Sequence, residues 1–170
     1  MTHFDNSLYR KPADICYYRQ ELEEITTPDI AQLYIDEGKK VFESFLAQHG
    51  LLVRKATYND LDAFFAYAKE RFAKLLGDTP VYSPYWLDHM ITSGHPMLLF
   101  DGKGNIKGYQ MEASYLDEER TSNGGGIAVD NDLKGLKMAV RLFDYVALLA
   151  MERGARVKRG IIAAYNFPSV

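Results

Sequence analysis

The sequence has 170 residues, of which 47% are hydrophobic and 25% are charged. These values are typical of a globular protein and exclude the disordered and fibrous classes. A formal net charge of -3 argues against a broad nucleic-acid-binding surface, and no apolar run reaches the roughly 20 residues of a membrane-spanning helix. The single cysteine, Cys16, excludes an internal disulfide and a multi-cysteine metal site. We therefore expect a cytoplasmic protein without a metal, a nucleic-acid partner or a membrane contact.

The first part of the chain predicts an arm followed by one long helix. Residues 1–26 are polar and aromatic without clean periodicity, and we assign them no chemistry. Thr27 suits a helix cap and Pro28 the first helical position, and Gly50 predicts the end. Gly38 weakens this helix by about 1 kcal/mol relative to alanine, and a tight contact with another helix is the expected reason. The residues expected to face inward are Ile30, Leu33, Tyr34, Val41, Phe45 and Leu46.

A change of period at "LLVRKA", residues 51–56, predicts a short strand. Thr57 and Asp60 then have the spacing of a capping box, so a second helix is expected to start there and to stop at Gly77. A third helix begins at Pro84 with Ser83 as its cap and ends near Gly94. The apolar stripe of the second helix consists of Leu61, Phe64, Phe65, Ala68, Phe72 and Leu75.

The last half of the chain predicts a hairpin and a strand-helix-strand unit. "HPMLLF" and "IKGYQMEASY" have strand character and are separated by the turn sequence "DGKGN". The polar loop "LDEERTSNG" leads to a short strand, "GGIAV", and "VKRGIIAAY" is a last strand. Between them a helix is expected from about Gly135 to Glu152. Its inward residues are Leu136, Val140, Phe143, Val146 and Ala150.

From Leu51 onward this order of elements resembles the GCN5-related N-acetyltransferase (GNAT) superfamily. Three stretches carry the resemblance: "LLVRKATYNDLDAFFAYA", "IAVDNDLKGLKMAVRLFDYVALLAMERGA" and "IIAAYNFPSV". The resemblance implies an α+β fold of the α/β type, with a mixed sheet and flanking helices, preceded by an amphipathic helix. It divides the chain into residues 1–50, an arm and a helix, and residues 51–170, a GNAT-like domain.

The resemblance also implies a turn that binds the pyrophosphate of acetyl-CoA. The family pattern is Gln or Arg, two variable residues, Gly, one variable residue, and Gly or Ala; it falls on Lys134, Lys137 and Ala139. Backbone N-H groups at a helix start favour an anion, and Lys137 replaces the central glycine. Asp130 and Asp132 compete for the same N-H groups, and in the alternative interpretation Asp132 caps the helix and no ligand binds. The implied cofactor contacts of the turn are Lys134, Gly135, Leu136, Lys137, Met138 and Ala139.

Two further parts of the acetyl-CoA site follow from the resemblance. The strands "GGIAV" and "IIAAY" are expected to splay, so that the backbone of Ile127, Ala128 and Val129 pairs with the pantetheine amides. Asn166 is implied to contact the pantetheine arm or the loop beside it, and Ser169 to open the next helix near the cofactor. Asn166 and its proline neighbour also suit an ordinary turn. The glycines at 124–126 permit close backbone approach, for which a bulge is an equally good explanation.

Acetyl transfer to an amine needs a base and a donor for the oxyanion. The strand "GGGIAV" has no acid, so Glu112 is the best candidate for the base, and a water chain to a backbone carbonyl stays open. An acceptor, a small-molecule or protein amine, is expected beside "YSPYWLDHM". Other polar side chains expected near this site are His89, His95, Tyr109 and Tyr115; the aromatic ones beside the acceptor are Tyr82, Tyr85 and Trp86.

The family's last helix and two strands have no counterpart after Val170, which leaves three explanations. The chain is a fragment, a partner chain or a second copy supplies the missing layer, or the domain is a reduced form used for binding. An unpaired "VKRGIIAAY" edge would tend to pair with another chain.

The resemblance implies an acetyl-CoA-dependent N-acetyltransferase. The alternative is a non-catalytic GNAT-fold assembly protein, such as a viral structural or internal protein.

Overall fold

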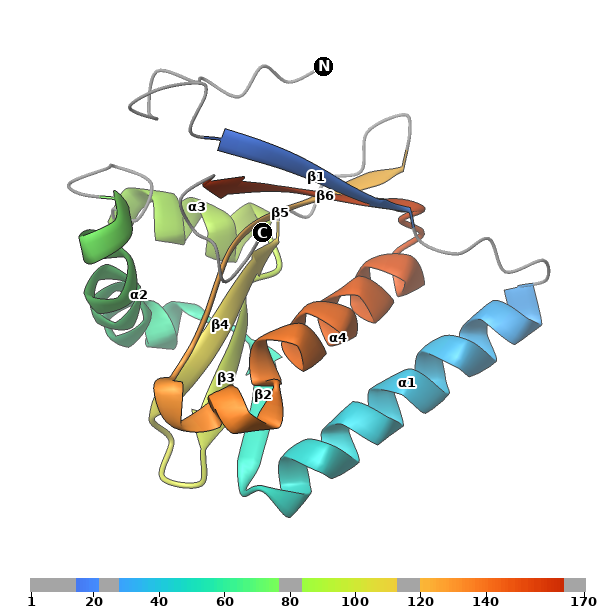
Figure 1. Cartoon of the computed structure of the whole chain (residues 1–170), viewed down its shortest axis with the longest axis horizontal. Coiled ribbons are helices and arrows are strands. Elements are labelled where there is room, and N and C mark those ends of the chain that lie inside the picture. The colour runs from blue at the N-terminus through green and yellow to red at the C-terminus, as the bar shows by residue number, and fades with distance from the viewer. Residues whose placement is uncertain (1–14, 22–27, 77–83, 113–119, 164–170) are drawn as a thin grey trace.

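The computed structural model describes residues 15–21, 28–76, 84–112 and 120–163. Within these ranges the strands form one six-stranded sheet in the order β1-β6-β5-β4-β3-β2 (Figure 1). Only β5 and β6 are parallel to each other, and every other neighbouring pair is antiparallel. The sheet is mixed and flanked by helices, as the sequence predicts.

The segment from β2 to β4 matches the expected elements closely. Strand β2, Leu51–Lys55, is followed by a 3-10 turn, and the carboxylate of Asp60 accepts hydrogen bonds from the backbone N-H and the hydroxyl of Thr57, both at 2.8 Å. These contacts start helix α2, Leu61–Leu76. The bounds of the next elements are α3, Pro84–Ser93; β3, Met97–Asp101; and β4, Ile106–Glu112.

The last part of the chain differs from the expected bounds at the start of its first strand and at the start of the central helix, whose end at Glu152 agrees with the prediction. Strand β5 covers Thr121–Val129, so it begins inside the stretch expected to be a loop. A 3-10 turn, Asn131–Leu136, then precedes helix α4, Met138–Glu152, which starts three residues later than predicted. Strand β6, Val157–Ala163, agrees with the prediction over its described length.

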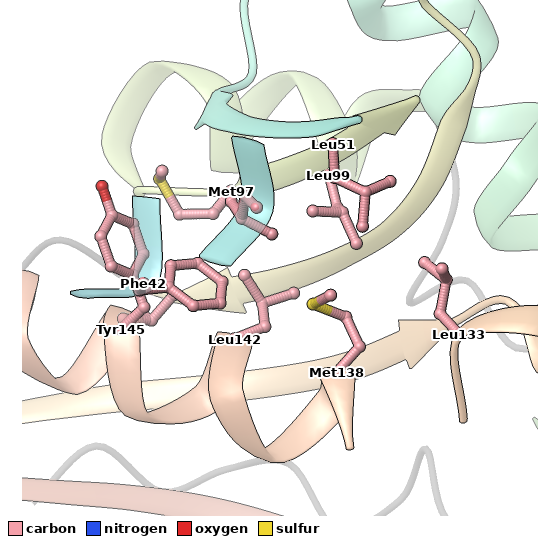
Figure 2. Packing of buried hydrophobic residues seen from close by; sticks show 10 residues of the cluster. Phe42, Leu51, Met97, Leu99, Leu133, Met138, Leu142 and Tyr145 are labelled. Carbon is pink, nitrogen blue, oxygen red and sulfur yellow. The ribbon is translucent and has the colours of Figure 1, made fainter. Parts of the chain in front are cut away.

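The two faces of the sheet carry separate hydrophobic cores. Neighbouring residues of β3 point to opposite faces, so that Leu99 contacts the core under α1 and α4 while Leu98 contacts the core under α2 and α3. Helix α1, Pro28–Gln48, lies beside α4 on the same face of the sheet (Figure 1). Figure 2 shows the first core, to which the two helices and the sheet contribute. Its labelled residues are Phe42, Leu51, Met97, Leu99, Leu133, Met138, Leu142 and Tyr145.

The sheet has one more strand than the sequence predicts. Strand β1, Ile15–Glu21, pairs antiparallel with β6 along the whole of both strands, from Ile15 opposite Ala163 to Glu21 opposite Val157. The expectation that residues 1–26 form an arm without regular structure is therefore wrong for this stretch. The β6 edge, expected to be open, is covered by the chain's own N-terminal strand, so no partner chain is needed there.

The inward faces of the two long helices also differ from the prediction. In α1 the exposed fractions of Leu33, Tyr34 and Val41 are 61%, 52% and 65%, whereas Ile35 and Phe42 are buried. Leu46 is buried, as predicted. In α4 the exposed fraction of Val140 is 60%. The buried residues of α4 are Met138, Leu142, Tyr145, Val146, Ala147 and Ala150. In the described part of the chain, no helix combines the length and the apolar character required to cross a membrane.

Candidate functional site

The central feature of the sheet is the place where its two parallel strands separate. Strands β5 and β6 pair only at Thr121, Ser122 and Asn123, which lie opposite Val157, Lys158 and Arg159. Beyond these pairs β5 continues beside β4, while β6 continues beside β1. Within the described residues, the second half of β5 therefore has no strand on its β6 side. This is the splay expected between "GGIAV" and "IIAAY".

A β-bulge lies in β5 at the start of the splayed part. The partners of Gln110 and Met111 are Ile127 and Gly125, so Gly126 is the extra residue. Its φ of 68° is the left-handed conformation that glycine adopts most easily. After the bulge, Ile127, Ala128 and Val129 pair with β4 on one side only. Their remaining backbone groups face the splay.

The turn after β5 contains an uncommon backbone conformation at Lys137. This residue has φ 52° and ψ 35°, which is left-handed, and its side chain is exposed. Its N-H already donates to the carbonyl oxygen of Lys134 at 2.9 Å. The family pattern puts glycine at this position, and the conformation explains that preference. A helix that began at about Gly135 would give Lys137 helical φ and ψ, so the expected start of the helix is wrong.

The N-H groups that a helix start leaves without an acceptor belong to the three residues after Lys137. The first helical bond of α4 runs from the N-H of Arg141 to the carbonyl oxygen of Lys137 at 3.1 Å. The N-H groups of Met138, Ala139 and Val140 therefore point toward the turn. The Met138 side chain is buried in the core, so only its backbone faces a ligand.

The exposed side of the turn is open and positively charged. Lys134, Gly135 and Ala139 are exposed, and a Cβ added to Gly135 would have no neighbour within 4 Å. Leu136 is half-buried against the first core. The turn thus presents free backbone donors beside Lys134 and Lys137 in a chain whose net charge is -3.

Asp130 does not compete for these donors, because other groups hold its carboxylate. It pairs with Lys107 at 2.7 Å and with Arg71, and it accepts a hydrogen bond from the Tyr67 hydroxyl at 2.8 Å. Burial favours the neutral acid, yet these hydrogen bonds and positive charges hold the pKa of Asp130 below its usual value. The carboxylate therefore ties the start of the turn to α2 and β4.

Asp132 does not cap α4 either. Its carboxylate pairs with Lys107 at 2.8 Å and its side chain is exposed. The residue before the first turn of α4 is Lys137, whose side chain makes no capping hydrogen bond. The part of the alternative interpretation in which Asp132 caps the helix is thus wrong.

The candidate base, Glu112, lies on β4 opposite Gly124, just before the bulge. Its exposed fraction is 0%. It accepts a hydrogen bond from the Ser122 hydroxyl and pairs with Arg153 at 3.2 Å, while Oε2 has no partner among the described residues. Burial raises the pKa of Glu112, although the charges of Lys158 and Arg153 oppose the rise.

Lys158 is the buried cation next to this carboxylate. Its exposed fraction is 0%, and Nζ lies 4.1 Å from the centre of the Phe143 ring and 3.4 Å from the Phe143 carbonyl oxygen. Burial lowers the pKa of Lys158 to about 8, although the negative charges of Glu112 and Asp144 oppose the shift. Since Lys158 pairs with Ser122, this charge cluster sits at the base of the splay.

Structural comparison decides the fold, since no family model matches the sequence and no curated protein matches it. AAC(6')-Iy in complex with the bisubstrate analogue CoA-S-monomethyl-acetylneamine superimposes with a TM-score of 0.55 at 15% identity, over 70% of this chain and 84% of that chain. The chain has the GNAT fold. A GNAT-family acetyltransferase from Brucella melitensis in complex with acetyl-CoA gives a TM-score of 0.52 at 14% identity, over 64% of this chain and 73% of that chain.

A third structure with the GNAT fold is longer than this chain. The GCN5-related N-acetyltransferase from Sphaerobacter thermophilus gives a TM-score of 0.52 at 17% identity and covers 66% of this chain. This chain spans only 36% of the length of that protein. The shared part is therefore the fold, and the activity of this chain has to be argued from its own residues.

The GNAT fold brings together most of the predicted cofactor contacts and separates the others. Residues 127–129 and 134–139 surround the end of the splay and the start of α4. Glu112 lies at the opposite end of the splay, inside the charge cluster. Asn166 and Ser169 lie outside the described residues, as do Tyr115 and the side chains of Tyr82, Tyr85 and Trp86.

The remaining polar candidates lie in different surroundings, and His95 contacts Glu112 through its backbone N-H, at 2.7 Å from the Glu112 carbonyl oxygen. The ring of Tyr109 is buried in the second core, 5.2 Å from Phe64. His89 is exposed on α3. Burial lowers the pKa of His95 to about 4, assisted by the charges of Arg153 and Lys55.

Lys158, Arg153 and Ser122 have no role in the site predicted from the sequence. The one available signal is the pair of charges at the start of the strand "VKRGIIAAY", Lys158 and Arg159. A lysine buried in a strand needs nearby negative charge, and Glu112 and Asp144 supply it.

Proposed function

We propose that this protein is an acetyl-CoA-dependent N-acetyltransferase that acts on an amine. The observation that carries the proposal is the splay of β5 and β6 beside the N-terminus of α4. A splayed pair of parallel strands offers unpaired backbone groups to the two amides of a pantetheine arm. The helix start supplies donors to a pyrophosphate at the end of that arm.

Each part of acetyl-CoA has a matching part of the site. The backbone of Ile127, Ala128 and Val129 binds the pantetheine amides. The N-H groups of Met138, Ala139 and Val140 bind the pyrophosphate, with Gly135 and Leu136 shaping the turn and Lys134 and Lys137 adding positive charge. Asn166 and Ser169 remain proposed contacts of the arm.

The transfer step needs the amine, the thioester of acetyl-CoA and one base. The neutral amine attacks the thioester carbonyl carbon, an N-C bond forms, and the C-S bond breaks as the tetrahedral oxyanion collapses. The amine loses one proton to the base, and the departing thiolate of coenzyme A gains one proton. We retain Glu112 as the candidate base. It is the carboxylate of β4, it lies close to the bulge in β5, and its raised pKa suits proton transfer.

The N-terminal part of the chain has a supporting role in this proposal. Residues 51–170 carry the acetyl-CoA site, while β1 and α1 cover the sheet edge and extend the helix layer beside α4. The acceptor, a small-molecule or protein amine, remains to be found by screening.

Calorimetric titration of the folded protein with acetyl-CoA tests the donor site. Binding is expected, and Lys137→Glu is expected to weaken it about tenfold, because a negative charge replaces a positive one beside the pyrophosphate. Lys103→Glu, at the exposed turn between β3 and β4, makes the same charge change away from the site and should leave the affinity unchanged. Absence of binding to the folded protein would refute the proposal.

Thiol release from acetyl-CoA in the presence of a panel of amines tests the transfer. An active amine should give one thiol per acetylated product, and Glu112→Gln should lower kcat and flatten its pH profile. Binding without any transfer would leave a donor site on a protein that does not catalyse this reaction.

A further inference from the structure

A hollow of about 390 Å³ opens between α1 and α4, on the side of α4 where the candidate turn lies. The two helices run antiparallel, because Lys39 pairs with Glu152 while Phe45 contacts Arg141. The C-terminal half of α1 therefore lies beside the first turns of α4. The residues that line the hollow are Lys40, Val41, Ser44, Phe45, Gln48 and Arg141.

The charge of this lining differs from that of the whole chain. The chain has a net charge of -3, yet the hollow is lined by two cations, two neutral polar side chains and no carboxylate. Lys40 pairs with Glu37 at 2.9 Å on the exposed helix surface, where such a pair contributes little. Its amine is thus available to an anion that enters the hollow.

Arg141 is held in a fixed position with part of its guanidinium group unused. Its guanidinium carbon lies 4.2 Å from the centre of the Phe45 ring, and Nε donates to the carbonyl oxygen of Leu136 at 3.1 Å. The Phe45 ring is in turn supported by the His49 ring at 4.4 Å. Neither terminal nitrogen of Arg141 has a hydrogen-bond partner among the described residues. An orientation fixed in advance lowers the entropic cost of binding a phosphate.

We propose that the hollow between α1 and α4 binds a phosphate monoester, and that, on the proposed function, this group is the 3'-phosphate of coenzyme A. A phosphate monoester carries close to two negative charges at pH 7, which match Lys40 and Arg141. The Nε group of Arg141 donates to the carbonyl oxygen of Leu136, a residue of the turn, so Arg141 links the hollow to the proposed pyrophosphate site. Ser44 and Gln48 give the hollow a polar wall for the attached ribose and base.

The assignment gives α1 a direct part in donor binding. Five of the six lining residues come from α1, a helix that precedes the GNAT-like part of the chain: Lys40, Val41, Ser44, Phe45 and Gln48. Donor selection would then depend on a segment outside residues 51–170.

Calorimetry with three probes tests the inference: coenzyme A, dephospho-coenzyme A and adenosine 3',5'-bisphosphate. The wild-type protein is expected to bind coenzyme A about tenfold more tightly than dephospho-coenzyme A, which lacks only the 3'-phosphate. Arg141→Gln and Lys40→Gln should each reduce this preference while the affinity for dephospho-coenzyme A stays constant. Lys103→Gln removes a charge elsewhere and should keep the preference.

The outcomes separate this inference from the proposed function. Equal binding of coenzyme A and dephospho-coenzyme A would overturn the inference and leave the proposed function intact. Binding of adenosine 3',5'-bisphosphate that depends on Arg141, without any acetyl transfer, would support the hollow and remove the function. If none of the three probes binds to the folded protein, both are overturned.

Discussion

Gly38 in the middle of α1 lies directly against Leu148 of α4. A Cβ added to Gly38 would meet Cδ1 of Leu148 at 2.6 Å, which confirms that a tight helix contact is the reason for glycine there. Glycine costs about 1 kcal/mol of helix propensity, and the close approach of α1 and α4 offsets this cost. The contact also limits the distance between α1 and α4, the two helices that line the hollow.

Gly38→Val is therefore expected to lower the free energy of unfolding by about 1 kcal/mol, because the branched side chain has to displace the end of the Leu148 side chain. Chemical denaturation measures this change. The matched control is Glu37→Val, which introduces the same side chain at the exposed neighbouring position. Equal effects of the two substitutions would contradict the contact.

Lys137 tests the backbone of the turn. Lys137→Gly is expected to keep the unfolding free energy within about 1 kcal/mol of the wild type. Glycine removes the backbone strain of a positive φ in the folded state, but it also raises the conformational entropy of the unfolded chain, and the two effects offset each other. Lys137→Ile should lower it by about 1 to 2 kcal/mol, because a branched side chain disfavours positive φ. Thermal unfolding of both variants gives the comparison.

The control for the turn is Lys134→Ile, since Lys134 is exposed and is absent from the positive-φ residues, Arg120 and Lys137. It should be clearly milder than Lys137→Ile. Similar losses at the two positions would show that the conformation of Lys137 does not matter.

Asp130 tests the anchoring of the turn to α2 and β4. Asp130→Asn should lower the unfolding free energy by about 1 to 3 kcal/mol at pH 7, because Arg71 loses its counter-charge and Lys107 keeps only that of Asp132. The folded-state pKa of Asp130 is below its unfolded value of about 3.9, so its contribution is present above that pH and is lost as the pH falls. The variant should consequently lose less stability than the wild type between about pH 5 and pH 2.

Asp132→Asn provides the comparison for this pair of measurements. Asp132 contacts the same Lys107, but its side chain is 62% exposed, so a change within about 0.5 kcal/mol is expected. A loss as large as that of Asp130→Asn would contradict the prediction that Asp130 is the residue that holds the turn to α2 and β4.

Lys158 predicts an effect of the same sign, a contribution to stability that rises with pH, in the alkaline range. Its folded-state pKa of about 8 lies below the unfolded value of about 10.4. Between these values the unfolded chain binds more protons, so the contribution of Lys158 to the unfolding free energy rises with pH. Relative to Lys158→Met, the wild type should gain on the order of 1 to 3 kcal/mol from pH 8 to pH 10.

Urea denaturation of both proteins across this range measures the difference. Other lysines and tyrosines also titrate there, but they are common to the two proteins and cancel. The groups that face Lys158 are Glu112, Asp144 and Arg153, and the first two oppose its deprotonation. A constant difference between the two proteins would show that Lys158 stays charged throughout.

The order of elements from α1 to β6 could be predicted because each has its own periodicity and stop signals. The faces of α1 could not, because the helix has two apolar stripes. Leu33, Tyr34 and Val41 form one at helical spacing, and Ile35, Phe42 and Leu46 form the other. Only the position of α4 decides which stripe is buried, and that is a tertiary contact.

The turn could be located but its conformation could not. The spacing of Lys134, Lys137 and Ala139 marks a cofactor turn by resemblance, whereas the positive φ of Lys137 has no signal in a lysine. The role of Asp130 depends on Tyr67 and Arg71 of α2, which are about 60 positions earlier in the chain. Long-range pairs of this kind leave no local pattern.

The pairing of β1 with β6 has a consequence for synthesis of the chain. Ile15–Glu21 is synthesised long before its partner, Val157–Ala163, so β1 has no strand to pair with in the meantime. Likewise α1 is synthesised long before α4, the helix on which it packs. The outer part of the sheet can thus form only once β6 has been made, and the α1 wall of the hollow only once α4 has been made, which predicts slow formation of this half of the molecule.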